Sequence, residues 1–323
     1  MRRYIAVDIG GTQVRAACYP ASKLKSIKIA RTTTQATDPE DPVTSPLERI
    51  QNLIASIWPA DGKVCAISVA APGPINPYQG ILVEAPNIPG WINVPLQQNL
   101  SERFKVPVVL GNDANLAALG EWKYGAGKGH HHLIYLTVST GIGGGVIIDD
   151  RLLLGANGLA AELGHTTVMI DGPLCGCGQR GHLEAVASGT AIANWVEAEL
   201  SQGVQSILPI DKPVSAKRIS EAAQKGDKLC IAALARAGHY IGRALADFLH
   251  IFNPSIVIIG GGVSKSGPLL LDPMYKAMQE HVLNPHYLDG LVLTTAAFGD
   301  EVGLVGALAL GRTTYPDCRS KKS

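Results

Sequence analysis

Three apolar, β-branched runs in this 323-residue chain each end in a cluster of glycines. The clusters occupy residues 10–11, 141–145 and 260–262. A strand that ends in glycines predicts a tight backbone turn that another group can approach closely, because glycine has no Cβ. Apolar residues resume directly after the first two clusters, at Val14 and Val146. This pattern favours β-hairpins over the strand-to-helix turn of a P-loop.

Strands and helices alternate in the rest of the pattern. Buried strands are predicted at residues 64–70 and 106–110, and helices at residues 47–57, 113–124 and 227–252. The alternation indicates an α/β protein, and the length together with 46% hydrophobic residues leaves room for two lobes. We expect a smaller N-terminal α/β lobe at residues 1–118 and a larger α/β lobe at residues 119–300.

The end of the chain is expected to divide into a helix and a tail. The apolar helix at residues 301–313 is predicted to pack back on the first lobe. Residues 314–323 are mostly polar, so we expect them to form a disordered tail.

Charge and composition exclude several classes of partner. The chain has 28 Lys and Arg residues against 27 Asp and Glu residues, so no broad basic field is available for nucleic acid or an anionic membrane. No stretch approaches the roughly 20 apolar residues that span a bilayer. The six cysteines lack the spacing of a disulfide framework, which indicates a reducing cytoplasm. Small molecules are the expected partners.

The first two glycine clusters are accompanied by groups that suit a polyphosphate. Their backbone N–H groups can approach phosphate oxygens without interference from side chains. Asp8 stands before the first cluster and could hold a metal ion, while Ser139 and Thr140 supply hydroxyls before the second. A single glycine pair would more often be a plain hairpin turn. The added carboxylate and hydroxyls favour phosphate binding.

Asn112 and Asp113 follow the predicted strand at residues 106–110 and open a helix. This position predicts a carboxylate that points into the mouth between the lobes, where it could act as a general base. An Asp or Asn that only caps the helix is the ordinary alternative. The presence of two phosphate loops in the same chain favours the catalytic interpretation.

A second group of residues offers metal ligands. Within residues 162–184 stand two cysteines, two histidines and two glutamates. Thiolates and imidazoles suit Zn²⁺ in a closed tetrahedral site, and His165, Cys175, Cys177 and His182 provide four such donors. Only one residue separates the two cysteines, unlike the spacing of an ordinary zinc finger. A buried reduced cysteine pair with two surface histidines is the structural alternative.

Taken in order from Tyr4 to about Gly311, these motifs resemble the ROK family of sugar kinases and repressors. The resemblance implies a two-lobed, actin-like or hexokinase-type ATPase fold with the active site in the interdomain cleft. It also implies ATP with catalytic Mg²⁺, and Asp113 as the catalytic base. The implied ATP-binding residues are Asp8, Gly10, Gly11, Thr12, Ser139, Thr140, Gly141, Gly143, Gly144, Gly260, Gly261 and Gly262.

The resemblance further implies a sugar site and a structural Zn²⁺. The implied substrate-binding residues are Gly73, Asn87, Asn112, Asp113, Glu162, His165 and Glu184. In the family the metal ligands are one His and three Cys, so His182 departs from the pattern by standing at the third Cys position. Imidazole can replace thiolate, and the resulting site is less negative and expected to bind the metal less tightly.

The most specific expectation is an ATP-dependent glucokinase, which converts glucose and ATP to glucose 6-phosphate and ADP. Another ROK hexose or N-acetylhexosamine kinase is the alternative, with mannose, N-acetylglucosamine or N-acetylmannosamine as substrate. A sugar-responsive repressor is disfavoured because its helix-turn-helix would precede the first phosphate motif, and only seven residues precede Asp8. We expect a cytoplasmic homodimer or homotetramer, and the pattern leaves polyphosphate open as a donor.

Overall fold

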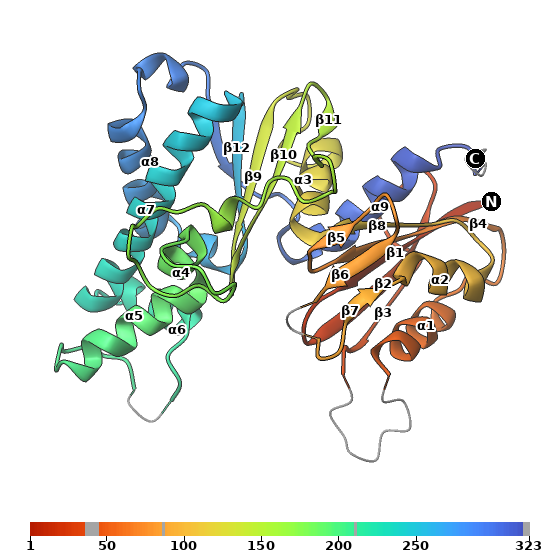
Figure 1. The fold of residues 1–323 in the computed structure, drawn as a ribbon, viewed down its shortest axis with the longest axis horizontal. Helices are drawn as coiled ribbons and strands as arrows, with labels where there is room; N and C mark the ends of the chain where they lie inside the picture. The colour runs from red at the N-terminus through yellow and green to blue at the C-terminus, as the bar shows by residue number, and fades with distance from the viewer. Residues whose placement is uncertain (36–44, 86–87, 210–211, 319–323) are drawn as a thin grey trace. The chain divides into compact units, whose positions relative to one another are not determined.

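The computed structural model describes residues 1–35, 45–85, 88–209 and 212–318, which divide into two compact units (Figure 1). The first unit consists of Met1–Lys128, Leu152–Ala161 and Asp300–Ser323, and the second of Gly129–Arg151 and Glu162–Gly299. The first unit is therefore assembled from three separate segments of the chain. The lobe boundaries expected at residues 118 and 300 stay predictions.

The first unit is built on a mixed sheet. Its elements are β1 (Arg2–Ile9), β2 (Gln13–Pro20), β3 (Lys28–Thr33), α1 (Pro46–Ser56), β4 (Lys63–Ala71), β5 (Ile75–Asn76), β6 (Ile81–Glu84), β7 (Ile92–Val94), α2 (Leu96–Phe104), β8 (Val108–Asn112), α3 (Asp113–Tyr124) and α9 (Val302–Thr314). Among the described residues the strand order is β3-β2-β1-β4-β8, with β1 antiparallel to β2 and parallel to β4. A small sheet β5-β6-β7 is inserted between β4 and β8.

Helices cover both faces of the first sheet. Ile5 and Val7 of β1 share a buried apolar cluster with Ile50 of α1. Tyr4 lies on the opposite face, beside Gly311 of α9. Successive side chains of a strand point to opposite faces, so a strand covered on both sides reads as a continuous apolar run. This explains why the sequence of β1 shows no polar alternation.

Two glycines allow α3 and α9 to cross closely. A Cβ on Gly306 would lie 2.1 Å from the carbonyl oxygen of Leu116, and a Cβ on Gly120 would lie 2.9 Å from the backbone nitrogen of Gly306. Real side chains do not tolerate such distances to backbone atoms. The contact therefore requires a bare backbone on both helices.

Gly306→Ala is expected to destabilise the first unit by about 1–3 kcal/mol, because the added methyl group overpacks the backbone of α3. Thermal or denaturant unfolding measures the effect. Thr313→Ala changes an exposed position of the same helix and serves as the control, with an expected change within about 0.5 kcal/mol. Equal stability of the two variants would contradict the close crossing.

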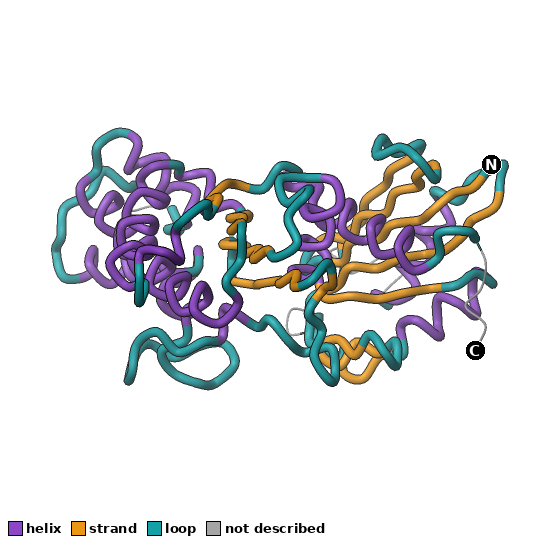
Figure 2. Tube along the Cα trace, turned by 90° about the horizontal axis from the view of Figure 1, so that it is seen from above, coloured by secondary structure: helices purple, strands orange, loops and turns teal. Residues whose placement is uncertain are grey.

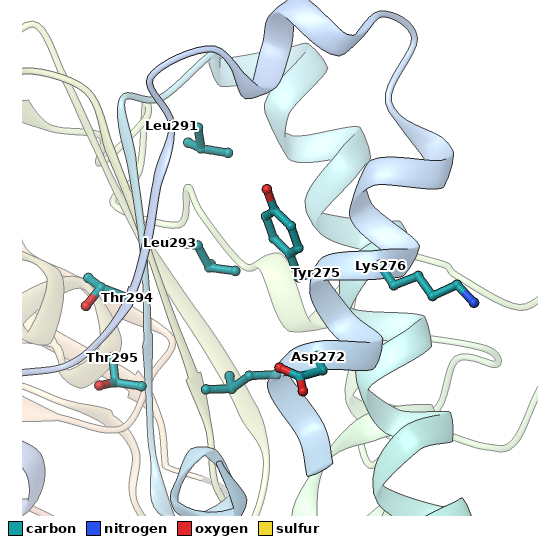
Figure 3. A pocket seen from close by; sticks show the side chains of 8 residues that line it. Asp272, Tyr275, Lys276, Leu291, Leu293, Thr294 and Thr295 are labelled. Carbon is teal, nitrogen blue, oxygen red and sulfur yellow. The ribbon is translucent and has the colours of Figure 1, made fainter. Parts of the chain in front are cut away.

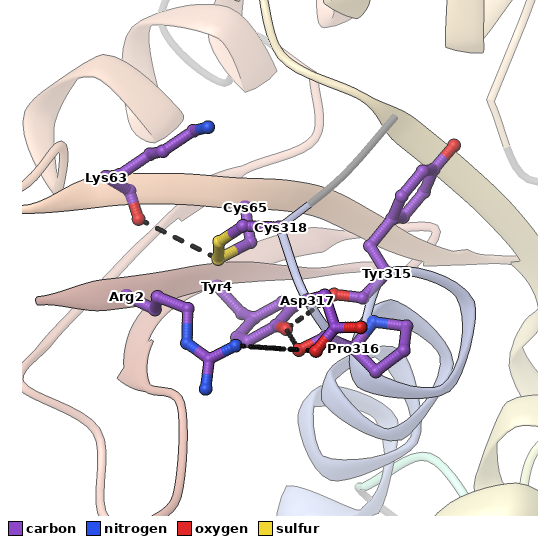
Figure 4. Close-up of a disulfide and its surroundings, with 8 residues drawn as sticks. All are labelled: Arg2, Tyr4, Lys63, Cys65, Tyr315, Pro316, Asp317 and Cys318. Carbon is purple, nitrogen blue, oxygen red and sulfur yellow. Dashed lines mark hydrogen bonds and ion pairs between the residues drawn. A yellow bond between two sulfur atoms is a disulfide. The ribbon is translucent and has the colours of Figure 1, made fainter. Parts of the chain in front are cut away.

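The segment after α9 returns to the first sheet (Figure 4). Tyr4 Oη donates a hydrogen bond to Tyr315 O at 2.7 Å, and a disulfide joins Cys65 of β4 to Cys318. The structure thus differs from the sequence analysis, which expected a disordered tail from residue 314 and no disulfide. The two cysteines are 253 positions apart, so their spacing carries no signal of the pairing. Residues 319–323 lie outside the described part of the chain.

The second unit has a sheet of the same kind. Its elements are β9 (Leu133–Val138), β10 (Ile142–Ile148), β11 (Arg151–Leu152), η1 (Leu163–His165), α4 (Leu183–Ala187), α5 (Gly189–Ser201), α6 (Ala216–Gln224), α7 (Lys228–Phe252), β12 (Ile256–Gly260), η2 (Gly262–Ser266), α8 (Pro268–His281), η3 (Pro285–Leu288) and β13 (Val292–Thr295), and η4 (Gly299–Glu301) leads into α9. In the described residues the strand order is β11-β10-β9-β12-β13. Helices α5 to α8 gather on one side of this sheet (Figures 1 and 2).

Several local predictions are confirmed. The first two glycine clusters close the hairpins β1–β2 and β9–β10. α3 begins at Asp113, as predicted. Of the helices in the described residues, none has the length and apolar character that would let it cross a membrane.

Candidate active site

In the first unit the predicted residues collect at the carboxyl ends of parallel strands. Asp8 of β1 is in register with Ala70 of β4, and the next residue of β4 is in register with Asn112 of β8. Parallel strands end at one edge of their sheet, and ligands of α/β proteins commonly bind at that edge. The pairing therefore brings Asp8 and Asn112 to the same edge.

Asn112, and not Asp113, caps helix α3. Asn112 Oδ1 accepts hydrogen bonds from the N–H groups of Ala114 at 3.0 Å and Asn115 at 3.1 Å. Asp113 is the first residue of the helix and is exposed, with Oδ1 2.7 Å from Ala114 N. The helix N-terminus favours a negative charge, so it stabilises the ionised carboxylate. Because another residue satisfies the cap, the position of Asp113 is not explained by capping.

The structure places Gly73 beside Asn112. A Cβ on Gly73 would lie 2.8 Å from Asn112 Nδ2, so only glycine leaves room for that amide. These two predicted sugar-binding residues thus meet at one end of the first sheet. Asn87, the third one predicted on loops of this part of the chain, lies outside the described residues.

The first glycine turn is held by a threonine that the sequence analysis missed. Gly10 N donates to Gln13 O at 2.8 Å, which closes the turn that contains Gly11 and Thr12. Thr34 is fully buried, and its Oγ1 donates to Gly10 O at 2.6 Å while its backbone N–H donates to Thr12 O. The turn is therefore supported by strand β3 and the residue that follows it.

Arg15 is a second residue that the sequence analysis missed. Its guanidinium donates to Asp8 Oδ2 from Nη2 at 2.5 Å and from Nε at 3.2 Å. Both side chains are largely buried, and Arg15 Nη1 also lies 3.7 Å from Glu301 Oε1. The sequence contains the information for this pair, because a hairpin that turns at residues 10–12 places Asp8 directly opposite Arg15.

In the second unit two of the glycine clusters meet. Gly260 at the end of β12 is in register with Thr137 of β9, just before the loop that carries Ser139, Thr140 and Gly141. Gly261 has φ +86°, and a Cβ there would lie 2.2 Å from Val138 O. The loop at residues 139–141 and the turn at residues 260–262, both predicted to bind ATP, therefore lie side by side at the carboxyl ends of the parallel strands β9 and β12. Gly143 and Gly144 continue into β10, and Gly262 begins η2.

The N-terminus of α5 contacts the loop at residues 139–141 through two hydrogen bonds. Gly189 N donates to Ser139 O at 2.7 Å, and Thr190 Oγ1 donates to Thr140 O at 2.9 Å. The side chains of Ser139 and Thr140 belong to exposed residues. The carbonyl groups of the loop are thus engaged by α5, which fixes the direction of the peptide units.

The four predicted metal ligands come together in the second unit. Their donor atoms all lie within 4.8 Å of one another. Cys177 Sγ is 3.2 Å from His182 Nδ1, the two Nδ1 atoms of His165 and His182 are 3.4 Å apart, and Cys175 Sγ is 3.7 Å from His165 Nδ1. Zn²⁺ bound tetrahedrally to nitrogen and sulfur would require separations of about 3.4–3.8 Å. The two sulfur and two nitrogen donors suit Zn²⁺, and the three separations given above lie within about 0.2 Å of that range.

Close packing fixes His165 in this cluster. His165 ends η1, and a Cβ on Gly164 would lie 1.9 Å from Ile142 O of β10. The glycine lets η1 lie directly against the strand. His165, one of the four candidate metal ligands, is thereby held against β10, the strand that follows the loop at residues 139–141.

Two titratable groups near the cluster have shifted pKa values. Burial raises the pKa of the Cys175 thiol to about 11, so a bound cation would have to displace a proton from it. Glu162 is an exposed residue, but partial burial of its carboxyl group raises the pKa of that group. The neighbouring Glu184 raises this pKa further, whereas His165 lowers it. Both shifts disfavour negative charge at this end of the unit in the absence of a metal.

A separate pocket of about 540 Å³ lies between α8 and β13. Figure 3 shows Tyr275 standing between the helix and Leu291 and Leu293 of the strand side, while Lys276 points away. None of the residues predicted to bind sugar, ATP or metal lines it. The pocket is therefore distinct from the residues described above.

Known proteins resemble this chain over nearly its whole length. The model of the ROK family matches residues 4–314. A glucokinase from Thermotoga maritima is 36% identical over 95% of this chain and 96% of its own length. A ROK family glucokinase from Streptomyces griseus, solved in complex with glucose and AMPPNP, is 34% identical with a TM-score of 0.80, over 96% of this chain and 99% of that one. A ROK hexokinase from Thermus thermophilus is 32% identical with a TM-score of 0.77, over 95% and 97% of the two chains.

Proposed function

The chain belongs to the ROK family, and on this premise we propose that it is an ATP-dependent glucokinase. The enzyme transfers the γ-phosphoryl group of ATP to a hydroxyl of glucose. It has the sugar-kinase fold of the actin-like ATPases, with mixed sheets and flanking helices. The observation that carries the proposal is the arrangement of candidate binding residues at the carboxyl ends of the parallel strands in each sheet. In the first unit these are Asn112 and Asp113, which suit a sugar, and in the second unit they are two glycine loops, which suit a nucleotide.

Asp113 is the group that accepts the proton from the sugar hydroxyl. Its exposed carboxylate stands at the N-terminus of α3, where the helix dipole favours its negative charge. Asn112 precedes it in the chain and Gly73 lies beside Asn112, and these two residues position the sugar through an amide and a backbone group. As the hydroxyl loses its proton to Asp113, its oxygen becomes the nucleophile towards the γ-phosphorus.

The glycine loops hold the nucleotide. Backbone N–H groups of residues 10–12 and 139–144 are the donors to the phosphates, supplemented by the hydroxyls of Thr12, Ser139 and Thr140. The turn at residues 260–262 lies next to the second loop and receives the adenosine. Both turns are braced, by Thr34 in one unit and by Thr190 in the other, so little loop ordering is required when ATP binds.

Asp8 would hold Mg²⁺ that accompanies the nucleotide. Its carboxylate is a hard oxygen donor at the mouth of the first phosphate turn, which fits this ion. Mg²⁺ would neutralise part of the negative charge on the phosphates of ATP. Arg15 already neutralises Asp8 in this structure, and its two hydrogen bonds keep the carboxylate in a fixed orientation.

His165, Cys175, Cys177 and His182 would hold a structural Zn²⁺. Four protein ligands leave no open position, so the ion would brace the loop and take no part in the reaction. Glu162 and Glu184 flank this loop and, with His165, complete the proposed set of sugar contacts. Coordination by one nitrogen of His165 leaves the other directed towards the sugar.

A coupled assay with ATP and Mg²⁺ tests the proposal on glucose, mannose, fructose, N-acetylglucosamine and N-acetylmannosamine. We expect glucose to give the highest kcat/KM. Preference for another of these sugars would show that the chain is a different ROK kinase. The absence of phosphorylation with every sugar would refute the proposed kinase activity. Replacing ATP by polyphosphate in the same assay identifies the donor.

We also propose that the enzyme works in the cytoplasm, where ATP is available, as a homodimer or homotetramer. Light scattering on the purified protein measures the oligomeric state. Reducing conditions in that compartment favour thiols over the Cys65–Cys318 bond. That bond joins β4 to the segment after α9 and includes none of the proposed site residues.

A further inference from the structure

Glu184 connects the metal cluster with the second phosphate loop. It lies in the first turn of α4. One carboxylate oxygen, Oε2, accepts a hydrogen bond from the backbone N–H of Ile142 at 2.9 Å. The other, Oε1, lies 3.7 Å from Cys175 Sγ. A single side chain therefore contacts both the loop and a proposed zinc ligand.

The loop is shaped to receive this carboxylate. A Cβ on Gly141 would lie 2.3 Å from Glu184 Oε2, so any larger residue at that position would push the carboxylate away. Ile142 is itself buried, with 4% of its surface exposed, and begins strand β10. Without Glu184 its N–H would lose a charged acceptor, and an unsatisfied buried N–H is costly.

Glu184 completes a set of contacts that fixes the loop from both sides. Ser139 N donates to Gly141 O across the turn at 2.9 Å, while Gly189 and Thr190 engage the carbonyl groups of Ser139 and Thr140. These contacts hold carbonyl groups on the α5 side. Glu184 is the acidic side chain that holds an N–H group on the other side.

We infer that Glu184 is a positioning residue for the nucleotide, which holds the Gly141–Ile142 peptide so that the loop is ordered before ATP arrives. The inference rests on the proposed nucleotide-binding role of this loop. This role is separate from the sugar contact proposed above for Glu184 and does not exclude it, because Oε2 is the oxygen that accepts from Ile142 N. The effect of its loss should therefore be seen in nucleotide binding when no sugar is present.

Calorimetric titration with Mg²⁺-AMPPNP in the absence of sugar tests this role. Glu184→Ala is expected to weaken nucleotide binding by about tenfold or more, because the charged hydrogen bond to a buried N–H is lost. Glu184→Gln keeps an oxygen that can accept from Ile142 and should restore most of the affinity. Glu197→Ala removes an exposed glutamate of α5 and is the control, with unchanged affinity expected.

The outcomes separate the inference from the function on which it rests. If wild-type protein phosphorylates a sugar but binds no nucleotide in the absence of sugar, the inference that the loop is ordered beforehand is wrong and the proposed function stands. If it neither phosphorylates a sugar nor binds the nucleotide, both are wrong. If wild-type protein binds and Glu184→Ala binds equally well, the inference alone is wrong. If Glu184→Gln binds as weakly as Glu184→Ala, the negative charge and not the hydrogen bond to Ile142 accounts for the loss, and the inference is wrong.

A second pair of variants examines the contact from the side of the loop. Gly141→Ala should displace the carboxylate and weaken nucleotide binding in the wild-type background. In the Glu184→Ala background the added methyl group has room, so the same change should cost severalfold less. An equal cost in both backgrounds would refute the contact as the source of the effect. Zinc content and circular dichroism of each variant show whether the metal and the fold are retained.

Discussion

Asp113→Asn is expected to lower kcat by roughly 10²-fold or more while the protein folds and binds glucose as before. The substitution retains size and hydrogen-bonding capacity but removes the charge that accepts the proton. Helix α3 should be unaffected, because its cap is the side chain of Asn112. The measurement combines steady-state kinetics with titration of glucose binding.

Two comparisons make this result specific to proton transfer. Circular dichroism and thermal unfolding establish that the variant is folded. Asp171→Asn replaces an exposed aspartate of the second unit and should leave kcat unchanged. A value of kcat near that of the wild type in Asp113→Asn would show that the carboxylate is not the base.

Cys175→Ser is expected to abolish zinc binding and to lower kcat/KM for glucose by about 10–100-fold, on the scale seen when the support of a metal site is lost. Cys175 is buried and its sulfur lies within hydrogen-bonding range of both His165 and Glu184. Its loss removes one of four ligands, and three ligands with a serine hydroxyl make a poor closed zinc site. Elemental analysis of the purified variant measures the zinc content.

His182→Cys provides the converse variant. It creates a set of one histidine and three cysteines and should retain one zinc per chain, with tighter binding, because thiolate is the softer and more negative ligand. Cys230→Ser removes a buried thiol on α7, outside the cluster, and should retain zinc. Wild-type protein that is fully active without zinc would overturn the assignment of the cluster.

Local patterns were sufficient to predict the hairpins, the start of α3 and the cysteine and histidine group. Each depends on residues that are close in the chain, such as glycines after an apolar run or a cap before a helix. The Asp8–Arg15 pair could also have been predicted, because the turn of a β-hairpin determines which residues of its two strands face each other.

Other contacts could not be predicted because they join distant segments. Glu184 and Ile142 are 42 positions apart, and Cys65 and Cys318 are 253 positions apart. Thr34 supports the first glycine turn only because β3 pairs with β2 and ends beside it. Such contacts depend on how the sheets assemble, and neither spacing nor periodicity carries that information.

The separation of the first unit into three segments bears on how the protein is made on the ribosome. α9 packs on β1 and β4, yet it is translated after the entire second unit. Strands β1 to β8 therefore emerge with one face of their sheet still lacking its helix, and that apolar face stays open until α9 is released. The second unit can complete its fold earlier, although its codons come later than those of β1 to β8. Synthesis thus proceeds from the amino terminus, while folding of the first unit finishes last, in contrast to the usual order in which the leading domain folds first.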